Sequence, residues 1–441
     1  MIANLAANAA TGIDTNQHVI LITIDGGAAY YFNDPKAPIP NLRKLAARGV
    51  VAKGMRISNP AVTWPNHTTL ITGVAPAKHS VLYNGLMVRN EKGGLSRESE
   101  KTQAELIAVP TVFDFLHGKG YSTAGVNWPC TVGSKTLDIT FPDVQDQLRY
   151  TTPRLVKELM ALKILDDSSE AAFMNKTGAK RDTIWANTAC HLLRTQPPNL
   201  MLLHFLQLDS TQHQFGPQGP EAYAALGLID QHIGEVLQTL DETGLRQRTS
   251  ILVTADHGFA RVYKHIVGIT VLREAGLLDK PDGKSRVQLI SEGGSAMIYL
   301  HSKETKEADR KSVIKLFKKH EGVDQIIEPK DFARLGYPSP ETNPGMPDLV
   351  LAAKDGYAFS AMDLLEKTIV PVGERGQGAH GYLSSNPKMN ALFIAAGRGI
   401  AKGKKIGLMN NIDVAPTVAH LLGQEFPGAD GKVLKSILAK P

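Results

Sequence analysis

The stretch His18-Val19-Ile20-Leu21-Ile22-Thr23-Ile24 is almost wholly apolar and runs directly into Asp25. Three further runs have the same form, and each is followed by a polar residue: 122–126 by Asn127, 201–208 by Asp209, and 250–255 by Asp256. Apolar runs of this length without alternation indicate strands buried on both faces, as in a parallel sheet covered by helices. The first run therefore predicts a central strand of such a sheet.

Segments of helical character separate these runs, at 40–48, 110–119, 181–195 and 220–243. Three of them begin with Pro, and Gly49 and Gly244 follow directly after two of them, which is the expected asymmetry of helix termini. Strands that alternate with helices predict an α/β fold. Because ligands of such sheets bind outside the carboxyl ends of the strands, we expect the four polar residues to meet at one edge.

The pattern changes between Gly258 and His380 to shorter, mixed elements. We expect a helix near 266–275, a strand at 296–301, a basic amphipathic helix over 303–318 and strands near 348–353. They indicate an inserted, smaller α+β lobe. The predicted division is 15–259 for the first part of the catalytic core, 260–375 for the cap-like lobe, and 376–425 for the completion of the core, with a strand at 390–396 and a last helix at 413–422.

The composition is that of a soluble globular protein, with 441 residues, 42% hydrophobic and 21% charged. The net charge is +6, but Lys and Arg are interleaved with acids, and we find no aromatic and basic platform for nucleic acid. We therefore expect no recognition of a nucleic-acid polymer. No run of about 18 apolar residues occurs, so we expect no membrane span. The oligomeric state is left open.

The two cysteines, Cys130 and Cys190, permit one disulfide at most and exclude a cysteine zinc cage, so a metal would have to use Asp and His. The first 14 residues are rich in Ala and resemble the small-residue end of a secretory signal, with Ala7-Asn8-Ala9 as a cleavage-like triplet. This favours a periplasmic or secreted protein, with the cytoplasm as the alternative.

Seven residues carry the strongest chemical signal: Asp25, Thr63, Asp209, His213, Asp256, His257 and His380. Asp209 and His213 are four apart where a strand leads into a helix, so both can face one ion. Gly258 follows the adjacent pair Asp256 and His257 and allows the chain to turn so that both converge. Singly, a strand-terminal Asp is more often a cap or turn former.

A lone His is more often a satisfied polar residue than a ligand. We apply that interpretation to His67, His79, His204 and His232.

Thr63 lies between Pro60 and Pro65, just before 67–72, which has the character of the first turns of a helix. The free amides and the dipole of a helix N-terminus favour an anion. A hydroxyl placed there can serve as a nucleophile. The alternative is a threonine that only caps the helix.

At these residues the chain resembles the nucleotide pyrophosphatase/phosphodiesterase family of the alkaline phosphatase superfamily. The motifs that carry the resemblance are Ile24-Asp25-Gly26, Thr63-Trp64-Pro65-Asn66-His67, Asp209-Ser210-Thr211-Gln212-His213 with Gly216-Pro217, Thr254-Ala255-Asp256-His257-Gly258 and Ala379-His380-Gly381-Tyr382. They occur in the family's order. Five ordered motifs are specific where one alone is not.

The resemblance implies an alkaline-phosphatase-like, mostly parallel central sheet flanked by helices, and two zinc ions, with manganese as an alternative. One zinc would be held by Asp209, His213 and His380. The other would be held by Asp25, Asp256 and His257 together with Thr63.

The implied activity is that of a metal-dependent phosphoric ester hydrolase, a phosphodiesterase or nucleotide pyrophosphatase acting on a small-molecule phosphate ester. Thr63 would attack phosphorus and expel the alcohol, and water would then release the phosphorylated threonine. Asn84 would bind a phosphoryl oxygen, and Trp64, Trp128 and Tyr382 are candidates for contact with the substrate.

The same metal core also serves phosphomonoesterases and phosphonate hydrolases, which stay open as alternatives. A monoesterase needs an added positive group, for which Lys53 and Arg375 are candidates. In phosphonoacetate hydrolases a lysine pair binds the substrate, whereas the comparable strand end here reads Asn127-Trp128-Pro129.

Overall fold

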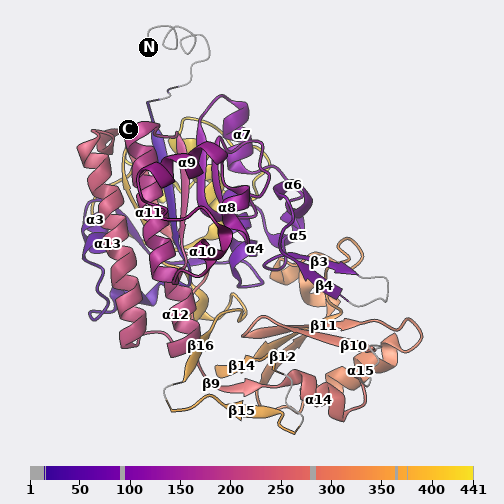
Figure 1. The fold of residues 1–441 in the computed structure, drawn as a ribbon. Coiled ribbons are helices and arrows are strands. Elements are labelled where there is room, and N and C mark those ends of the chain that lie inside the picture. The colour runs from indigo at the N-terminus through magenta and orange to yellow at the C-terminus, as the bar shows by residue number, and fades with distance from the viewer. Residues whose placement is uncertain are drawn as a thin grey trace.

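A sheet of eight strands forms the centre of the protein (Figure 1). The computed structural model describes residues 14, 16–89, 95–278, 285–362, 366–374 and 376–440. In sheet order the strands are β18 (Lys404–Asn410), β2 (Val50–Arg56), β17 (Phe393–Gly397), β8 (Thr249–Thr254), β1 (His18–Ile24), β7 (Leu200–Phe205), β5 (Thr123–Pro129) and β6 (Ile139–Asp143). Five of the seven neighbouring pairs are parallel, and only β17 runs against its neighbours β2 and β8. The predicted mostly parallel α/β sheet is confirmed.

Strand β1 lies near the middle of this sheet and is buried along its whole length. Val19 and Leu21 pack into the apolar cluster on one face, and Ile20, Ile22 and Ile24 into the cluster on the other. Each fully buried aliphatic side chain of this kind stabilises the fold by roughly 1.5–3 kcal/mol. Burial on both faces is the reason that the run His18–Ile24 shows no alternation.

Helices cover both faces of the sheet (Figure 1). On the side of Ile20 lie α3 (Pro40–Ala47), α11 (Gly178–Thr195) and α13 (Pro220–Glu242). On the side of Val19 lie α4 (Thr63–Thr72), α7 (Val112–Gly118) and α17 (Val414–Leu421). Pro begins α3 and α13, and Gly244 follows α13 with a φ of 68°, a conformation that glycine adopts without steric cost.

A region of shorter elements lies beneath the core in Figure 1. It contains the antiparallel sheet β10-β11-β13-β12 and a second sheet in which β14, β15 and β16 all pair with β9. The bounds are β9 (Ala260–Ile266), α14 (Gly268–Glu274), β10 (Val287–Ser291), β11 (Ser295–Leu300), α15 (Lys306–Phe317), β12 (Val323–Ile327), α16 (Pro329–Phe332), β13 (Leu349–Ala353), β14 (Gly356–Phe359), β15 (Ile369–Pro371) and β16 (Gln377–Ala379). We call this region the lobe; its predicted limits, 260 and 375, stay a prediction.

The hairpin of β3 (Leu86–Arg89) and β4 (Leu95–Glu98) belongs to the core by sequence position but packs on the lobe. The side chain of Gln288 in β10 accepts a hydrogen bond from the amide of Leu95 and donates one to its carbonyl oxygen, both at 3.1 Å. Tyr83, just before this hairpin, shares a buried hydrogen bond with Tyr299 of β11. The chain on either side of Asn84 is therefore held by the lobe.

Short helices complete the described part of the core. They are α2 (Tyr30–Asn33), α5 (Pro76–His79), α6 (Gln103–Leu106), α8 (Gln147–Tyr150), α9 (Pro153–Ala161) and α10 (Glu170–Met174). Both cysteines are buried and free. Among the described residues, no helix combines the length and the apolar character that crossing a membrane requires.

Two predicted boundaries were wrong. The run 201–208 is not one strand, because β7 ends at Phe205 and α12 (Gln207–Phe215) begins two residues later. The amides of Leu206 and Gln207 donate to the buried carboxylate of Asp182, which favours the early start of this helix. Helix α4 begins at Thr63 rather than at His67, since Pro65 is tolerated in the first turn.

Candidate active site

The acidic residues of the predicted site meet at the carboxyl edge of the central sheet. Asp25 follows β1, and Asp256 follows β8, its parallel neighbour. On the other side of β1 is β7, which leads into the helix that carries Asp209 in its first turn. Parallel pairing thus brings together residues that are up to 231 positions apart in the chain.

Asp25, Asp256 and His257 form a group that we call the closed group, since all three side chains are buried. His257 Nε2 lies 3.4 Å from Asp25 Oδ1 and 3.3 Å from Asp256 Oδ2. The amides of Gly26 and His257 donate to Asp256 Oδ1, at 3.2 and 2.9 Å. Backbone hydrogen bonds therefore fix one oxygen of Asp256 and leave the other facing His257.

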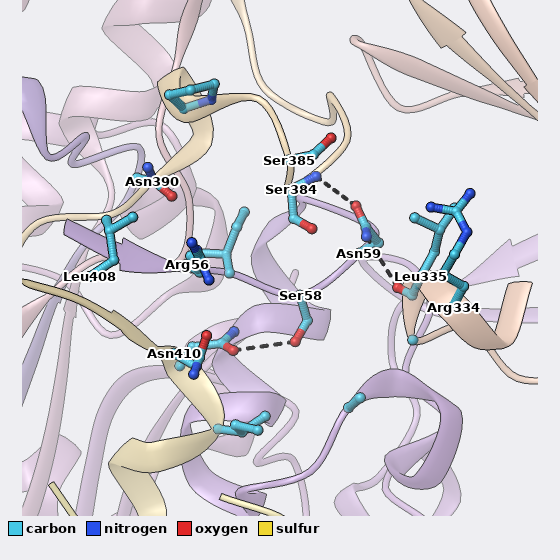
Figure 2. Close-up of a pocket in the computed structure, with 16 residues that line it drawn as sticks. Arg56, Ser58, Asn59, Arg334, Leu335, Ser384, Ser385, Asn390, Leu408 and Asn410 are labelled. Carbon is cyan, nitrogen blue, oxygen red and sulfur yellow. Dashed lines mark hydrogen bonds between the residues drawn. The ribbon is translucent and has the colours of Figure 1, made fainter.

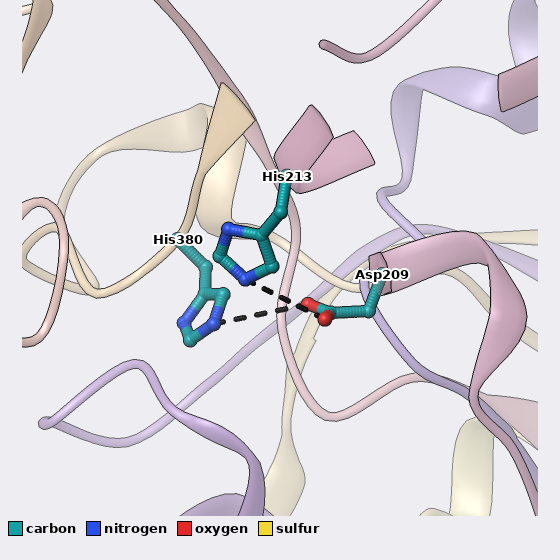
Figure 3. A group of neighbouring side chains, drawn as sticks. All are labelled: Asp209, His213 and His380. Carbon is teal, nitrogen blue, oxygen red and sulfur yellow. Dashed lines mark ion pairs between the residues drawn. The ribbon is translucent and has the colours of Figure 1, made fainter. Parts of the chain in front are cut away.

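Asp209, His213 and His380 form a second group, which we call the open group (Figure 3). Asp209 Oδ2 lies 3.5 Å from His213 Nε2, one helical turn further along α12, and Asp209 Oδ1 lies 3.7 Å from His380 Nε2. The side chain of His213 is 45% exposed, so this group faces solvent. The rings of His257 and His380 stack with their centroids 3.9 Å apart, which places the two groups side by side.

The ring nitrogens of the two stacked histidines show which atoms are free to bind a ligand. His257 Nδ1 donates to the carbonyl oxygen of Gly258 at 3.2 Å, and His380 Nδ1 donates to that of Ala61 at 3.0 Å. Burial lowers the pKa of His257 well below 6.5 and that of His380 to about 4, so both rings are neutral at pH 7. Each Nε2 therefore presents a lone pair toward a carboxylate oxygen.

The carboxylates of the site repel one another. Burial raises the pKa of Asp25 well above 3.8, and the negative charges of Asp256 and Asp209 raise it further. Burial also raises the pKa of Asp256 to about 7, against a hydrogen bond with Asp25 that lowers it, and the charge of Asp209 adds to the rise. A bound cation reverses this preference, because it stabilises the ionised carboxylates.

The donor set fits divalent metal ions. In the described part of the chain, Asp25 Oδ1, Asp256 Oδ2, His257 Nε2 and Asp209 Oδ1 are buried without a hydrogen-bond partner. Buried polar atoms are normally satisfied, so four such atoms pointing into two three-residue groups call for another partner. Three nitrogen and oxygen ligands with one position left for substrate are typical of a catalytic metal site.

Thr63 is the first residue of α4, and its side chain lies within a buried helix end. The carbonyl oxygen of Ala61, two residues earlier, accepts the hydrogen bond from His380, which links this turn to the open group. Nδ1 of His67 donates to the carbonyl oxygen of Thr63 at 2.9 Å and lies 3.8 Å from Asp256 Oδ2, which links it to the closed group. The start of α4 thus adjoins both groups.

Asn84 accepts a hydrogen bond at Oδ1 from the amide of Trp64, at 2.9 Å. This contact holds Asn84 at the N-terminus of α4, beside Thr63, and leaves its amide nitrogen as a donor. The indole of Trp64 is 6% exposed and its Nε1 lies 3.3 Å from Asp143 Oδ2.

The other candidates for substrate contact are placed differently. Trp128 is fully buried, and its ring packs edge-on against His67 with centroids 4.8 Å apart, so it has no face for a substrate. Tyr382 is also buried, and its hydroxyl donates to the carbonyl oxygen of Tyr357. Lys53 is exposed on β2, and Arg375 and the Ala7 triplet lie outside the described residues.

Two histidines that the sequence interpretation left out lie against the closed group. His204 Nε2 is 3.4 Å from Asp25 Oδ2, and both side chains are buried. Thr23 Oγ1 contacts both His204 and His67, at 2.9 Å each. His204 lies inside the run 201–208, which is otherwise largely apolar. A histidine within such a run is the sequence signal that could have pointed to this residue.

Comparison with known structures shows the same fold. Human ectonucleotide pyrophosphatase/phosphodiesterase 5 superposes with a TM-score of 0.73 at 19% identity, over 96% of this chain and all of that one. The murine protein, as an inactive threonine-to-alanine variant in complex with AMP, gives a TM-score of 0.72 at 19% identity with the same coverage.

Relatives found by sequence point the same way. Bovine (Bos taurus) bis(5'-adenosyl)-triphosphatase ENPP4 is 25% identical over 407 residues, which is 92% of this chain and 78% of the relative. Rat (Rattus norvegicus) ectonucleotide pyrophosphatase/phosphodiesterase family member 3 is 26% identical over 243 residues, 54% of this chain but only 24% of that longer protein.

The fold and the paired Asp and His groups define a metal-dependent hydrolase of phosphate esters with an alkaline-phosphatase-like sheet. Residues 19–383 match the model of the type I phosphodiesterase / nucleotide pyrophosphatase family. The chain belongs to that family, as its motifs predict.

Proposed function

We propose that the protein cleaves small nucleotide-like phosphodiesters at a pair of zinc ions, with Thr63 as the nucleophile. The observation that carries the proposal is that Thr63 begins α4, and the start of this helix is hydrogen-bonded to His380 and, through His67, adjoins Asp256. The closed group would hold one ion together with Thr63 Oγ1, and the open group would hold the other.

Zinc fits the nitrogen and oxygen donors of both groups, and manganese is the alternative that such ligands also accept. When bound, two divalent cations neutralise the charge that develops on the entering and leaving oxygens of an in-line displacement.

The residues of the chain supply the nucleophile and its orientation. Thr63 Oγ1 forms the new bond to phosphorus as the bond to the leaving alcohol breaks, and the alcohol leaves with a proton. Water then attacks the phosphorylated threonine and restores its hydroxyl. The side-chain amide of Asn84 and the backbone amide of Thr63, the first of α4, would donate to the phosphoryl oxygens.

A nucleotide-like substrate is supported by the relatives, whose names include a bis(5'-adenosyl)-triphosphatase and whose solved structures include a complex with AMP. Trp64 follows the nucleophile directly and is 6% exposed, which supports it as the aromatic candidate for contact with the leaving or retained group.

The test compares hydrolysis of bis(p-nitrophenyl) phosphate and p-nitrophenyl phosphate by zinc-loaded protein, before and after chelation. We expect a strong preference for the diester and loss of the reaction on chelation. A preference for the monoester would keep the metal pair and replace the substrate class with phosphomonoesters. Reaction with neither would leave a phosphonate hydrolase as the remaining candidate.

We also propose that the protein works outside the cytoplasm, which the prefix in the name ectonucleotide pyrophosphatase/phosphodiesterase of a relative supports. Fractionation of cells that express the full natural coding sequence tests this. Recovery with a cytoplasmic marker enzyme would contradict it.

A further inference from the structure

A cavity of about 620 Å³ opens between the core and the lobe, outside the two metal groups (Figure 2). Residues from four segments and Ala75 line it; the segments are 56–59 at the end of β2, 334–336 in the lobe, 384–390 after His380, and 408–412 at the end of β18. None of the six Asp and His ligands lines it, and neither does Thr63, Asn84 or Trp64. The cavity has the size of a small-molecule site but is separate from the proposed catalytic centre.

The charge of the cavity has one sign. Arg56 and Arg334 are its charged lining residues, and no acidic side chain lines it. The guanidinium of Arg334 is 3.9 Å from a carboxylate oxygen of Asp331, whereas that of Arg56 has no hydrogen-bond or ion-pair partner among the described residues. The cavity therefore favours an anion, and Arg56 is free to pair with it.

Polar side chains and Leu408 lie around Arg56. Figure 2 shows it between Asn390 and Asn410, with Ser384 and Ser385 across the cavity. The side-chain amide groups of Asn390 and Asn410 make no hydrogen bond with another described residue. A guanidinium flanked by amide and hydroxyl donors matches the oxygens of a phosphoryl group.

We propose that this cavity is a second binding site, in which a small phosphorylated molecule binds with its phosphoryl group on Arg56 and thereby changes the rate of turnover at the metal centre. Binding in the cavity does not depend on the proposed function, whereas the effect on turnover rests on it.

The link to catalysis runs through Asn59. Its Oδ1 accepts a hydrogen bond from the amide of Ser384 at 2.8 Å, and its Nδ2 donates to the carbonyl oxygen of Leu335 at 3.1 Å. Asn59 thus joins three walls of the cavity, and it lies four residues before Thr63.

The neighbouring residue Ser58 is held in the same way. Its amide donates to Asn66 Oδ1, and Asn66 Nδ2 donates to the carbonyl oxygens of Pro60 and Val62. A ligand that moves this wall therefore acts on the turn that carries the nucleophile.

Binding is tested by calorimetric titration of zinc-loaded protein with inorganic phosphate. The wild type should bind two phosphate ions per chain, one at the metals and one in the cavity. Arg56→Ala should bind one, and Lys405→Ala, which removes an exposed cation from the neighbouring strand β18 outside the cavity, should still bind two. Thr63→Ala should also bind two, whatever its activity. Equal stoichiometry in Arg56→Ala and Lys405→Ala would overturn the site.

Steady-state kinetics distinguish an effect of the cavity on turnover from competition by phosphate at the metals. Phosphate that competes at the metals raises KM for bis(p-nitrophenyl) phosphate and leaves kcat unchanged. Occupation of the cavity should change kcat in the wild type and in Lys405→Ala, on the order of fivefold, as in weak allosteric coupling. In Arg56→Ala, added phosphate should raise KM and leave kcat unchanged. A kcat that is independent of phosphate in all three proteins would overturn the regulatory role.

Discussion

The closed and open groups use similar ligands but are built in different ways. Asp25 and Asp256 of the closed group follow adjacent strands, and backbone amides hold one oxygen of Asp256. Asp209 and His213 of the open group lie on a single turn of α12, and His213 is 45% exposed. If each group holds one ion, as proposed, we expect the closed group to bind its ion more tightly than the open group, which faces solvent.

The largest effect is expected from Thr63→Ala, which removes the proposed nucleophile that lies between the groups. Diester hydrolysis should fall by about 10⁴-fold or more, because no other hydroxyl replaces it. Both ions should stay bound, since each group keeps its Asp and His ligands. Turnover and metal content measured on the same samples check this.

The matched control is Thr72→Ala in the last turn of the same helix, where the hydroxyl donates only to the carbonyl oxygen of Thr68. It should keep most of the activity. If Thr63→Ala also keeps near-normal activity, Thr63 is not the nucleophile.

Substitutions in the closed and open groups should respond differently to added zinc. Asp256→Asn should abolish activity with loss of one ion, and added zinc should not restore it, because the buried site loses a charge that the cation needs. His213→Ala should lose activity at limiting zinc and recover as zinc is raised. Equal recovery of both variants would remove the proposed difference between the groups.

A smaller effect is expected from the histidine behind the closed group. His204→Gln should lower zinc affinity or activity by about 10–100-fold, the usual cost of removing a residue that orients a metal ligand. Among the described residues, the side chain of His204 contacts Asp25 at 3.4 Å, Thr23 and His67, and it contacts no residue of the open group. Loss of the ion in the open group, with the closed group intact, would contradict this assignment.

The smallest effect is a pH dependence of stability. Burial raises the folded-state pKa of Asp256 from 3.8 to about 7. At a pH between these two values, the metal-free protein therefore takes up protons when it folds. Its stability therefore falls as the pH rises from about 4 to about 7.

Zinc displaces these protons, so the gain in Tm on adding zinc should be larger at about pH 8 than at about pH 6. In Asp256→Asn the gain should depend less on pH. A gain that is independent of pH in the wild type would show that the carboxylates do not compete with protons for the ion.

The sequence was enough to predict the sheet because its strands are buried on both faces, as the packing of Val19 and Ile20 into opposite clusters shows. Asp25 and Asp256 could be found because each follows a strand that ends at the same edge, and Asp209 because it lies in the first turn of the helix after β7. At the starts of α4 and α12 the amides donate to Asn84 and to Asp182, which are distant in sequence and which an apolar pattern does not encode.

Other features depended on contacts distant in sequence. His204 looks like part of a strand, and only the pairing of β1 with β7 directs it at Asp25. Trp128 lies near the end of strand β5, where a binding residue could stand, but His67 of helix α4 packs against its ring. The hydrogen bond between Tyr83 and Tyr299, which holds the chain beside Asn84, joins the core to the lobe and leaves no local signal.

The most direct test of the account is anomalous diffraction from crystals of the protein grown with zinc. We expect two peaks, one within bonding distance of Asp25, Asp256 and His257, and one within bonding distance of Asp209, His213 and His380, with Thr63 Oγ1 beside the first. A single shared peak, or peaks outside the two groups, would contradict the two-ion site from which the proposed function is derived.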